Sequence, residues 1–227
     1  MNDLLRIHTL FHPALVSSAE PVLLVLLPGF DMQAEDFLRQ GFVATAQRHA
    51  PEVDVILAEP DLDLYLEGAI AAHLSALLQS KGADYRRIWL AGISLGCFAA
   101  LLAIERYTRI EGVVLLAPFL GTTGLIAEIG RAGGLGVWDP GVIVEDDHER
   151  RLLARLKAYA ARPETWPALY LGYGRSDRFA ATSRLLAAVL PPSRVTEIEG
   201  AHDWPSWGRL WERILADGPL ASNPAGQ

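Results

Sequence analysis

A serine inside a G-x-S-x-G pattern is the residue whose setting most directly suggests chemistry. The pattern spans residues 92–96, with Ser94 at its centre. It lies between a short apolar run at 88–91, typical of a buried strand, and an Ala/Leu-rich helical pattern at 97–107. A tight strand-to-helix turn lifts a serine hydroxyl above the sheet edge, and glycines permit the close backbone approach. The pattern therefore predicts a nucleophile at Ser94, with an ordinary Gly-Ser-Gly turn as the alternative.

A serine hydroxyl is a weak nucleophile and needs a base, usually a histidine that a third group holds in place. Among the six histidines, His202 follows the last predicted strand, 195–198, in the loop at its carboxyl end. In an open parallel sheet, such loops share one edge with the serine turn. His202 is therefore the expected base, and a solvated loop histidine is the alternative. A histidine base must be neutral, so we expect activity to rise between about pH 6 and 8.

The acid that orients the histidine should come from another loop at the same edge. Asp177 follows the predicted strand 169–172 and precedes a helix, where a simple N-cap is the alternative role. Asp203 is a poor orienter of His202, because side chains of adjacent residues diverge. The stretch 118–122, after another strand, carries no carboxylate. These observations favour Asp177.

An acyl-transfer site also needs donors for the oxyanion. The backbone N–H of Leu95, directly after the serine, is one expected donor. The other is the N–H of Phe30, in the turn that ends the aliphatic run 22–27, where Gly29 lets the backbone come close. An ordinary strand-to-helix turn would have the same sequence.

The chain resembles the α/β-hydrolase superfamily, in particular its small carboxylesterase and thioesterase members, over nearly its full length. The resemblance rests on four stretches, residues 27–30, 92–96, 174–177 and 200–202, and on the order of serine, acid and histidine. It implies that Ser94 is the nucleophile, His202 its base and Asp177 the acid, with Phe30 and Leu95 supplying the oxyanion N–H groups.

The expected function is hydrolysis of a small-molecule carboxylic ester or thioester through an acyl-enzyme on Ser94. An acyltransferase or perhydrolase using the same residues is one alternative, and a non-catalytic binding protein that retains the fold is another. Pro28 is a departure from the resemblance, because many relatives have histidine before the glycine. The proposed donor is a backbone group, so the oxyanion site does not depend on that side chain.

Composition limits the classes of partner. A net charge of −7 argues against nucleic acid and anionic membranes, which need a basic patch. The single cysteine, Cys97, excludes an internal disulfide and is expected to be a buried structural thiol. No Cys/His spacing suggests zinc, so we expect neither metal nor cofactor. The start of the chain lacks a signal-peptide pattern and no apolar run is long enough to span a membrane, which predicts a cytoplasmic protein.

Strands and helices alternate along the chain, which predicts one α/β domain over 1–227, with a mostly parallel twisted sheet and helices on both faces. Strands are expected at 4–11, 22–27, 53–58, 88–91, 112–117, 169–172 and 195–198. Helices are expected at 34–48, 65–79, 97–107, 150–160, 179–190 and from 205 onward. The glycine-rich segment 118–166 interrupts the alternation as a short cap or lid, or as a surface excursion with its own small core. The tail, 217–227, is expected to be frayed.

Overall fold

The computed structural model describes residues 6–220 and shows a seven-stranded sheet with strand order β1-β3-β2-β4-β5-β6-β7. The strands are β1 (Ile7–His12), β2 (Val22–Leu27), β3 (Val53–Pro60), β4 (Arg87–Ile93), β5 (Ile110–Leu116), β6 (Ala168–Gly174) and β7 (Val195–Ile198). Only β1 pairs antiparallel, and every other strand pair in the sheet is parallel. The carboxyl ends of β2 to β7 therefore meet at one edge of the sheet.

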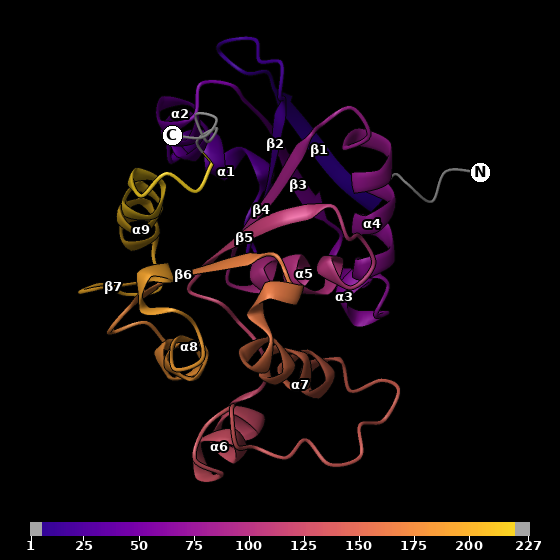
Figure 1. Ribbon diagram of the computed structural model, residues 1–227, viewed down its shortest axis with the longest axis vertical. Coiled ribbons are helices and arrows are strands. Elements are labelled where there is room, and N and C mark those ends of the chain that lie inside the picture. Colours follow the sequence, from indigo (N-terminus) through magenta and orange to yellow (C-terminus); the bar gives the residue numbers. More distant parts are fainter. Residues whose placement is uncertain (1–5, 221–227) are drawn as a thin grey trace.

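Helices cover both faces of this sheet (Figure 1). They are α1 (Ala34–Arg39), α2 (Phe42–His49), α3 (Leu62–Leu66), α4 (Ile70–Lys81), α5 (Leu95–Ile104), α6 (Thr123–Arg131), α7 (His148–Ala161), α8 (Ala180–Ala187) and α9 (Trp204–Ala216), with short 3₁₀ turns at Pro163–Thr165 and Pro192–Arg194. Helices α1, α2 and α9 cover one face, and the others lie on the opposite face. The predicted α/β fold with a mostly parallel sheet is confirmed.

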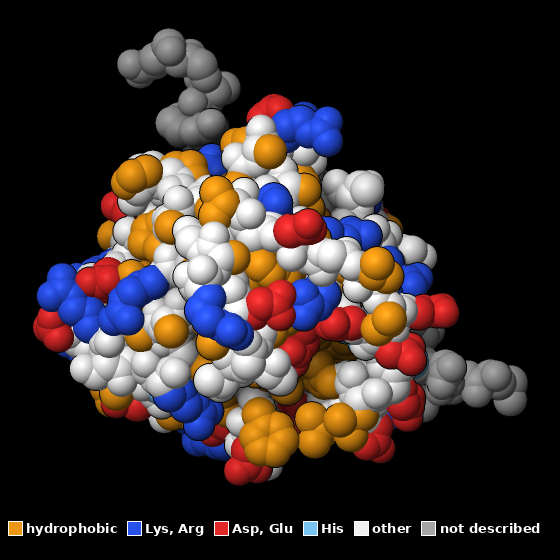
Figure 2. Space-filling model, turned by 90° about the horizontal axis from the view of Figure 1, so that it is seen from below, with side chains coloured by type: hydrophobic (Ala, Val, Ile, Leu, Met, Phe, Trp, Pro, Cys, Tyr) orange, Lys and Arg blue, Asp and Glu red, His pale blue; other side chains and the backbone are white. Residues whose placement is uncertain are grey.

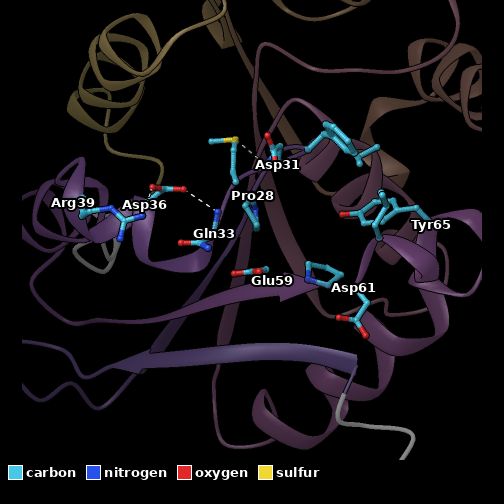
Figure 3. Close-up of a pocket in the computed structure, with 14 residues that line it drawn as sticks. Pro28, Asp31, Gln33, Asp36, Arg39, Glu59, Asp61 and Tyr65 are labelled. Atoms are coloured by element: carbon cyan, nitrogen blue, oxygen red, sulfur yellow. Dashed lines mark hydrogen bonds and ion pairs between the residues drawn. The ribbon is translucent and has the colours of Figure 1, made fainter.

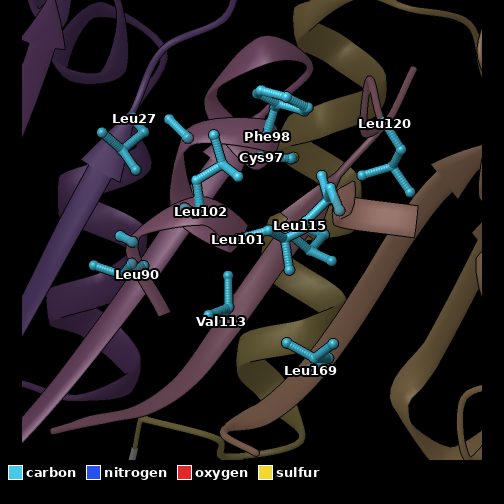
Figure 4. Packing of buried hydrophobic residues seen from close by; sticks show 14 of the residues in the cluster. Leu27, Leu90, Cys97, Phe98, Leu101, Leu102, Val113, Leu115, Leu120 and Leu169 are labelled. Carbon is cyan, nitrogen blue, oxygen red and sulfur yellow. The ribbon is translucent and has the colours of Figure 1, made fainter. Parts of the chain in front are cut away.

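The sheet divides the apolar interior into two clusters. In β2 the side chains of Leu23, Val25 and Leu27 enter one cluster, and their neighbours Val22 and Leu24 enter the other. All six residues of this strand are buried, as a continuous aliphatic run predicts for a central parallel strand. Figure 4 shows the first cluster, in which residues of α5 pack over side chains of β4, β5 and β6.

Two helices that were predicted to be continuous are each divided in two, because a glycine with positive φ interrupts them. The helix expected at 34–48 is two helices, α1 and α2, separated at Gly41, whose φ is 75°. The helix expected at 65–79 is likewise split into α3 and α4 near Gly68, whose φ is 68°. Apolar spacing continues across both glycines, so periodicity alone does not reveal the turns.

Within the insertion, 118–166, the chain forms α6 and α7 with a long loop between them (Figure 1). The indole N–H of Trp138 donates to Glu128 at 2.8 Å, and Arg150 pairs with the same carboxylate at 2.7 Å. Apolar side chains of α6 and α7 belong to the same cluster as those of α5. The insertion therefore rests on the main core, and its role as a lid stays a prediction.

The described chain ends packed against the sheet. Leu220 is buried, and Arg87 donates hydrogen bonds to the carbonyls of Pro219 and Leu220 at 3.4 and 3.3 Å. The expected frayed tail is thus packed as far as Leu220, and residues 221–227 lie outside the described part, as do residues 4 and 5 of the first predicted strand. Between residues 6 and 220, no helix is both long and apolar enough to cross a bilayer.

Candidate active site

Ser94 joins β4 directly to α5 in a backbone conformation that side-chain-bearing residues rarely adopt. Its φ is 53° and its ψ is −113°. The N–H of Ser94 donates to Leu116 at 3.0 Å, and its carbonyl accepts from the N–H groups of Cys97 and Phe119, each at 3.1 Å. These three hydrogen bonds hold the strained turn, and strain of this kind concentrates at functional sites.

The glycines of the G-x-S-x-G pattern are required by close backbone contacts. A Cβ at Gly92 would lie 2.4 Å from the carbonyl carbon of Gly96. A Cβ at Gly96 would lie 2.1 Å from the carbonyl oxygen of Leu27, at the end of β2. Neither contact is sterically possible without movement of the backbone. The pattern therefore lets the start of α5 pack directly against the end of β2.

Asp177 and His202 are in direct contact at the carboxyl edge of the sheet. Nδ1 of His202 lies 2.8 Å from Oδ2 of Asp177, and the other carboxylate oxygen accepts the N–H of Phe179 at 2.7 Å. The side chain of Asp177 is fully buried and that of His202 is 10% exposed. A carboxylate only accepts hydrogen bonds, so Nδ1 carries the proton and Nε2 is left as an acceptor. This is the tautomer that a general base requires.

Two aromatic rings fix the orientation of the imidazole. Phe179 and Trp207 meet the His202 ring edge to face, with ring centroids 5.1 and 4.9 Å away. The neighbouring Asp203 does not hold the imidazole and instead caps α9 by accepting the N–H of Ser206 at 2.9 Å. Hydrogen bonds from Ser206 keep the pKa of Asp203 below its usual value. Trp207 lies in the helix predicted from 205 onward, but its contact with the histidine is a tertiary feature that the sequence pattern does not reveal.

Ser94 and His202 line the same cavity, which has a volume of about 390 Å³. Phe30, Met32 and Arg178 also line it. Ser94 is 5% exposed, and no hydrogen bond joins its hydroxyl to His202 within residues 6–220. Structures without substrate often leave the nucleophile and its base apart, and the contact forms when substrate is bound. The structure thus places Asp177 against His202, and places His202 and Ser94 around one cavity.

The two expected oxyanion donors flank the serine. Leu95 is the first residue of α5, so its N–H has no intrahelical acceptor. Phe30 follows Gly29, and a Cβ at Gly29 would lie 3.2 Å from Cβ of Ser94. Neither N–H donates a hydrogen bond within the described part of the chain. The sulfur of Met32 accepts the N–H of Gly29 at 3.1 Å and so holds this turn. No sequence motif predicted this role of Met32.

Two larger cavities adjoin the serine turn and share Leu62, Tyr65 and Leu95. The first, of about 600 Å³, is lined by several carboxylates together with Phe30 and is drawn in Figure 3. The second, of about 720 Å³, is mainly apolar and is bounded on one side by residues of the insertion. On the face seen from below, Figure 2 shows a hollow with apolar side chains inside it and acidic side chains along its edge.

Cys97 is buried one turn after Ser94, as expected for a structural thiol. Its S–H donates to the carbonyl of Gly92 at 3.0 Å. Burial raises the pKa of the Cys97 thiol well above its usual value. The thiolate is therefore strongly disfavoured, which argues against a reactive cysteine at this position.

Comparisons with known proteins bear on the fold. No protein-family model matches the chain, and no curated protein sequence matches it. Among solved structures, S-formylglutathione hydrolase (FrmB) from Staphylococcus aureus is similar, with a TM-score of 0.59, 16% identity, and 88% of this chain and 82% of that chain covered.

Two further structures are similar over almost the whole of both chains. A ferulic acid esterase has a TM-score of 0.58 at 12% identity, with 92% of this chain and 96% of that chain covered. MGS-MChE2, an α/β-hydrolase enzyme from a metagenome of lagoon sediments at Mar Chica, Morocco, has a TM-score of 0.57 at 18% identity, with coverages of 93% and 94%. At these identities the likeness concerns the fold. The chain has the α/β-hydrolase fold.

Proposed function

We propose that the protein is a serine hydrolase that cleaves a carboxylic ester or thioester through an acyl-enzyme on Ser94. The observation that carries this proposal is the 2.8 Å contact between His202 and Asp177, made by a histidine that lines one cavity with Ser94. Two of the structural neighbours are named as a hydrolase and an esterase, which agrees with the proposal. Fold alone does not carry function, so the proposal rests on the site.

In the proposed reaction, the hydroxyl oxygen of Ser94 attacks the acyl carbon while Nε2 of His202 takes the hydroxyl proton. Asp177 stabilises the imidazolium that forms. The N–H groups of Phe30 and Leu95 donate to the oxyanion, and such donors are each worth about 10²–10³ in rate. His202 then protonates the departing alcohol or thiol, and water, activated by the same imidazole, releases the acid.

The leaving group and the acyl group should occupy different cavities. His202 protonates the leaving group, so that group lies in the cavity that His202 lines. The acyl group then extends past Leu95 towards the larger cavities, of which the second is mainly apolar. An apolar acyl group is therefore the expected substrate feature.

A fluorophosphonate probe tests this function, because it reacts covalently with an activated serine. We expect the wild type to be labelled and to hydrolyse 4-nitrophenyl acetate, and Ser94→Ala to lose both properties. Ser193→Ala, which changes an exposed serine in the turn before β7, is the matched control and should behave as the wild type. A wild type that is neither labelled nor active would instead support a non-catalytic binding protein.

The same assay separates hydrolysis from acyl transfer. A hydrolase releases mainly free acid when a simple alcohol is added, whereas an acyltransferase releases mainly the new ester. Adding hydrogen peroxide and assaying peracid tests for a perhydrolase. Predominant transfer in either arm would replace the hydrolase proposal while leaving the roles of Ser94, Asp177 and His202 in place.

A further inference from the structure

The hydroxyl group of Tyr65 has no hydrogen-bond partner in the part of the chain that the structure describes. Tyr65 lies in α3, directly after β3 ends at the carboxyl edge of the sheet. Its ring packs against the core cluster that contains Cys97, and it lines both of the larger cavities. In Figure 3 the Tyr65 hydroxyl points into the first cavity, towards the side where Pro28 lies.

Two other tyrosines, Tyr85 and Tyr173, show what this one lacks, whereas the buried hydroxyl of Tyr159 is also without a partner among the described residues. The hydroxyl of Tyr85 donates to Asp54 at 2.7 Å, and that of Tyr173 donates to Glu197 at 2.5 Å. The Tyr65 hydroxyl makes no hydrogen bond to any residue between 6 and 220. Burial raises the pKa of Tyr65 above its ordinary value, so the phenol keeps its proton at neutral pH. It is therefore a neutral donor directed into a cavity.

Two of the four acidic side chains that line the same cavity already have backbone donors. Glu59 accepts the N–H of Ala34 at 2.7 Å, and Asp36 accepts the N–H of Gln33 at 2.8 Å. The residues that share this cavity with Tyr65 also include Phe30 and Leu95, the two sources of oxyanion N–H groups. Three residues with a donor that has no partner among residues 6–220, the backbone N–H of Phe30 and of Leu95 and the phenol of Tyr65, thus line a single cavity next to the serine turn.

We propose that the Tyr65 hydroxyl is a third hydrogen-bond donor to the oxyanion, and hence a catalytic residue of the hydrolase proposed above, on which this inference rests. An oxyanion has three lone pairs, and it can accept a third hydrogen bond that a ground-state carbonyl accepts less well. The phenol donates without transferring its proton, so the covalent steps of the reaction are unchanged. Because it acts on the carbonyl oxygen, its effect does not depend on which acyl group is bound.

The test is Tyr65→Phe, which removes only the hydroxyl, assayed with 4-nitrophenyl acetate, butyrate and benzoate. We expect kcat/KM to fall about 10- to 100-fold, by the same factor for all three esters and mainly through kcat. The rate of fluorophosphonate labelling should fall in parallel. Tyr85→Phe is the control, because its phenol is bonded to Asp54 and lines none of the three cavities, so its activity should be that of the wild type.

Unchanged kinetics in Tyr65→Phe, or a loss confined to one of the three esters, would overturn the inference. A loss that comes from misfolding is recognised by a lowered unfolding temperature. In that case 3,5-difluorotyrosine at residue 65 replaces the test, because it keeps the shape and lowers the phenol pKa. The rate should then fall as this phenol ionises at high pH, and a wild-type pH profile would refute the role. The hydrolase proposal has a different test, because it fails if the fluorophosphonate probe does not label Ser94 of the wild type.

Discussion

Oδ2 of Asp177 lies 2.8 Å from Nδ1 of His202 although 25 residues separate them in the sequence. The loops after β6 and β7 bring them together, because these two strands are parallel neighbours whose carboxyl ends meet. A Cβ at Gly174 would lie 2.3 Å from the carbonyl oxygen of Gly200, so the two loops pack backbone against backbone. The contact between Asp177 and His202 thus follows from the parallel pairing of β6 with β7. It determines which imidazole nitrogen carries the proton.

Replacing this acid with its amide tests the role of that contact. In Asp177→Asn the amide NH₂ can donate to Nδ1, which places the proton on Nε2 and removes the base. We expect kcat to fall about 10³–10⁴-fold, with the unfolding temperature little changed. Steady-state hydrolysis of 4-nitrophenyl acetate measures the loss.

Asp203→Asn is the matched control, since Asp203 is next to the histidine but caps α9. Loss of the charged cap should cost up to about 1 kcal/mol of stability and leave kcat close to the wild-type value. If Asp203→Asn were the more damaging change to kcat, the assignment of Asp177 as the acid would be wrong.

The close packing of the serine turn predicts a severe effect of a single methyl group. Gly96→Ala brings a Cβ against the carbonyl oxygen of Leu27, so the start of α5 must move away from β2. We expect activity to fall at least about 100-fold, since displacements near 1 Å have that effect in active sites. Overpacking should also cost about 1–3 kcal/mol of stability.

Gly130→Ala is the control for this substitution. Gly130 lies in α6, and a Cβ there would meet no atom within 4 Å. Alanine is the better helix former, so this variant should be as stable as the wild type or more stable, with unchanged activity. Urea unfolding and ester hydrolysis measure both variants, and an active Gly96→Ala enzyme would contradict the steric argument.

The sequence predicted well those features that local patterns determine. The bounds of β2 and β7 match those predicted. In β2 the reason is its continuous aliphatic run, which is the local signature of a buried parallel strand. The turns at Gly41 and Gly68 were missed because an apolar face continues on both sides of each. Glycine can adopt either helical or positive-φ conformations, so a glycine in the sequence does not by itself predict that a helix ends there.

The candidate site likewise combines features that local sequence patterns predict with features that they do not. Ser94, Asp177 and His202 each follow a strand, so a parallel sheet is enough to predict that they lie at one edge. The packing of Trp207 and Phe179 on the imidazole, and the direction of the Tyr65 hydroxyl, depend on the relative positions of separate helices. Such contacts leave no periodicity or motif in the chain.

The buried thiol predicts an absence of reactivity. Cys97 is enclosed and bonded to Gly92, and burial raises its thiol pKa, so the folded protein should react with a thiol reagent such as DTNB only on unfolding. Cys97→Ala should retain activity and lose about 1 kcal/mol of stability through the small cavity it creates. Rapid modification of the folded wild type, with loss of activity that Cys97→Ala resists, would contradict this.

The ion pair inside the insertion predicts a dependence of stability on acid pH. Hydrogen bonds from Arg150 and then Trp138 lower the pKa of Glu128 to about 2. In the unfolded chain a glutamate titrates near pH 4.3, so the carboxylate favours the folded state above that value. Its contribution should be lost as the pH falls from about 4.5 towards 2, where the folded protein also becomes protonated.

Glu128→Gln removes the charge and keeps the shape of the side chain. We expect the variant to unfold at a lower temperature than the wild type at pH 7, and the two unfolding temperatures to converge as the pH approaches 2. Glu164→Gln, an exposed residue of the same insertion, is the control and should follow the wild type throughout. The Glu128 side chain is 38% exposed, so the difference at pH 7 should also shrink in 1 M salt. A difference between wild type and Glu128→Gln that is the same at pH 3 and pH 7 would show that the charge of Glu128 does not stabilise the insertion.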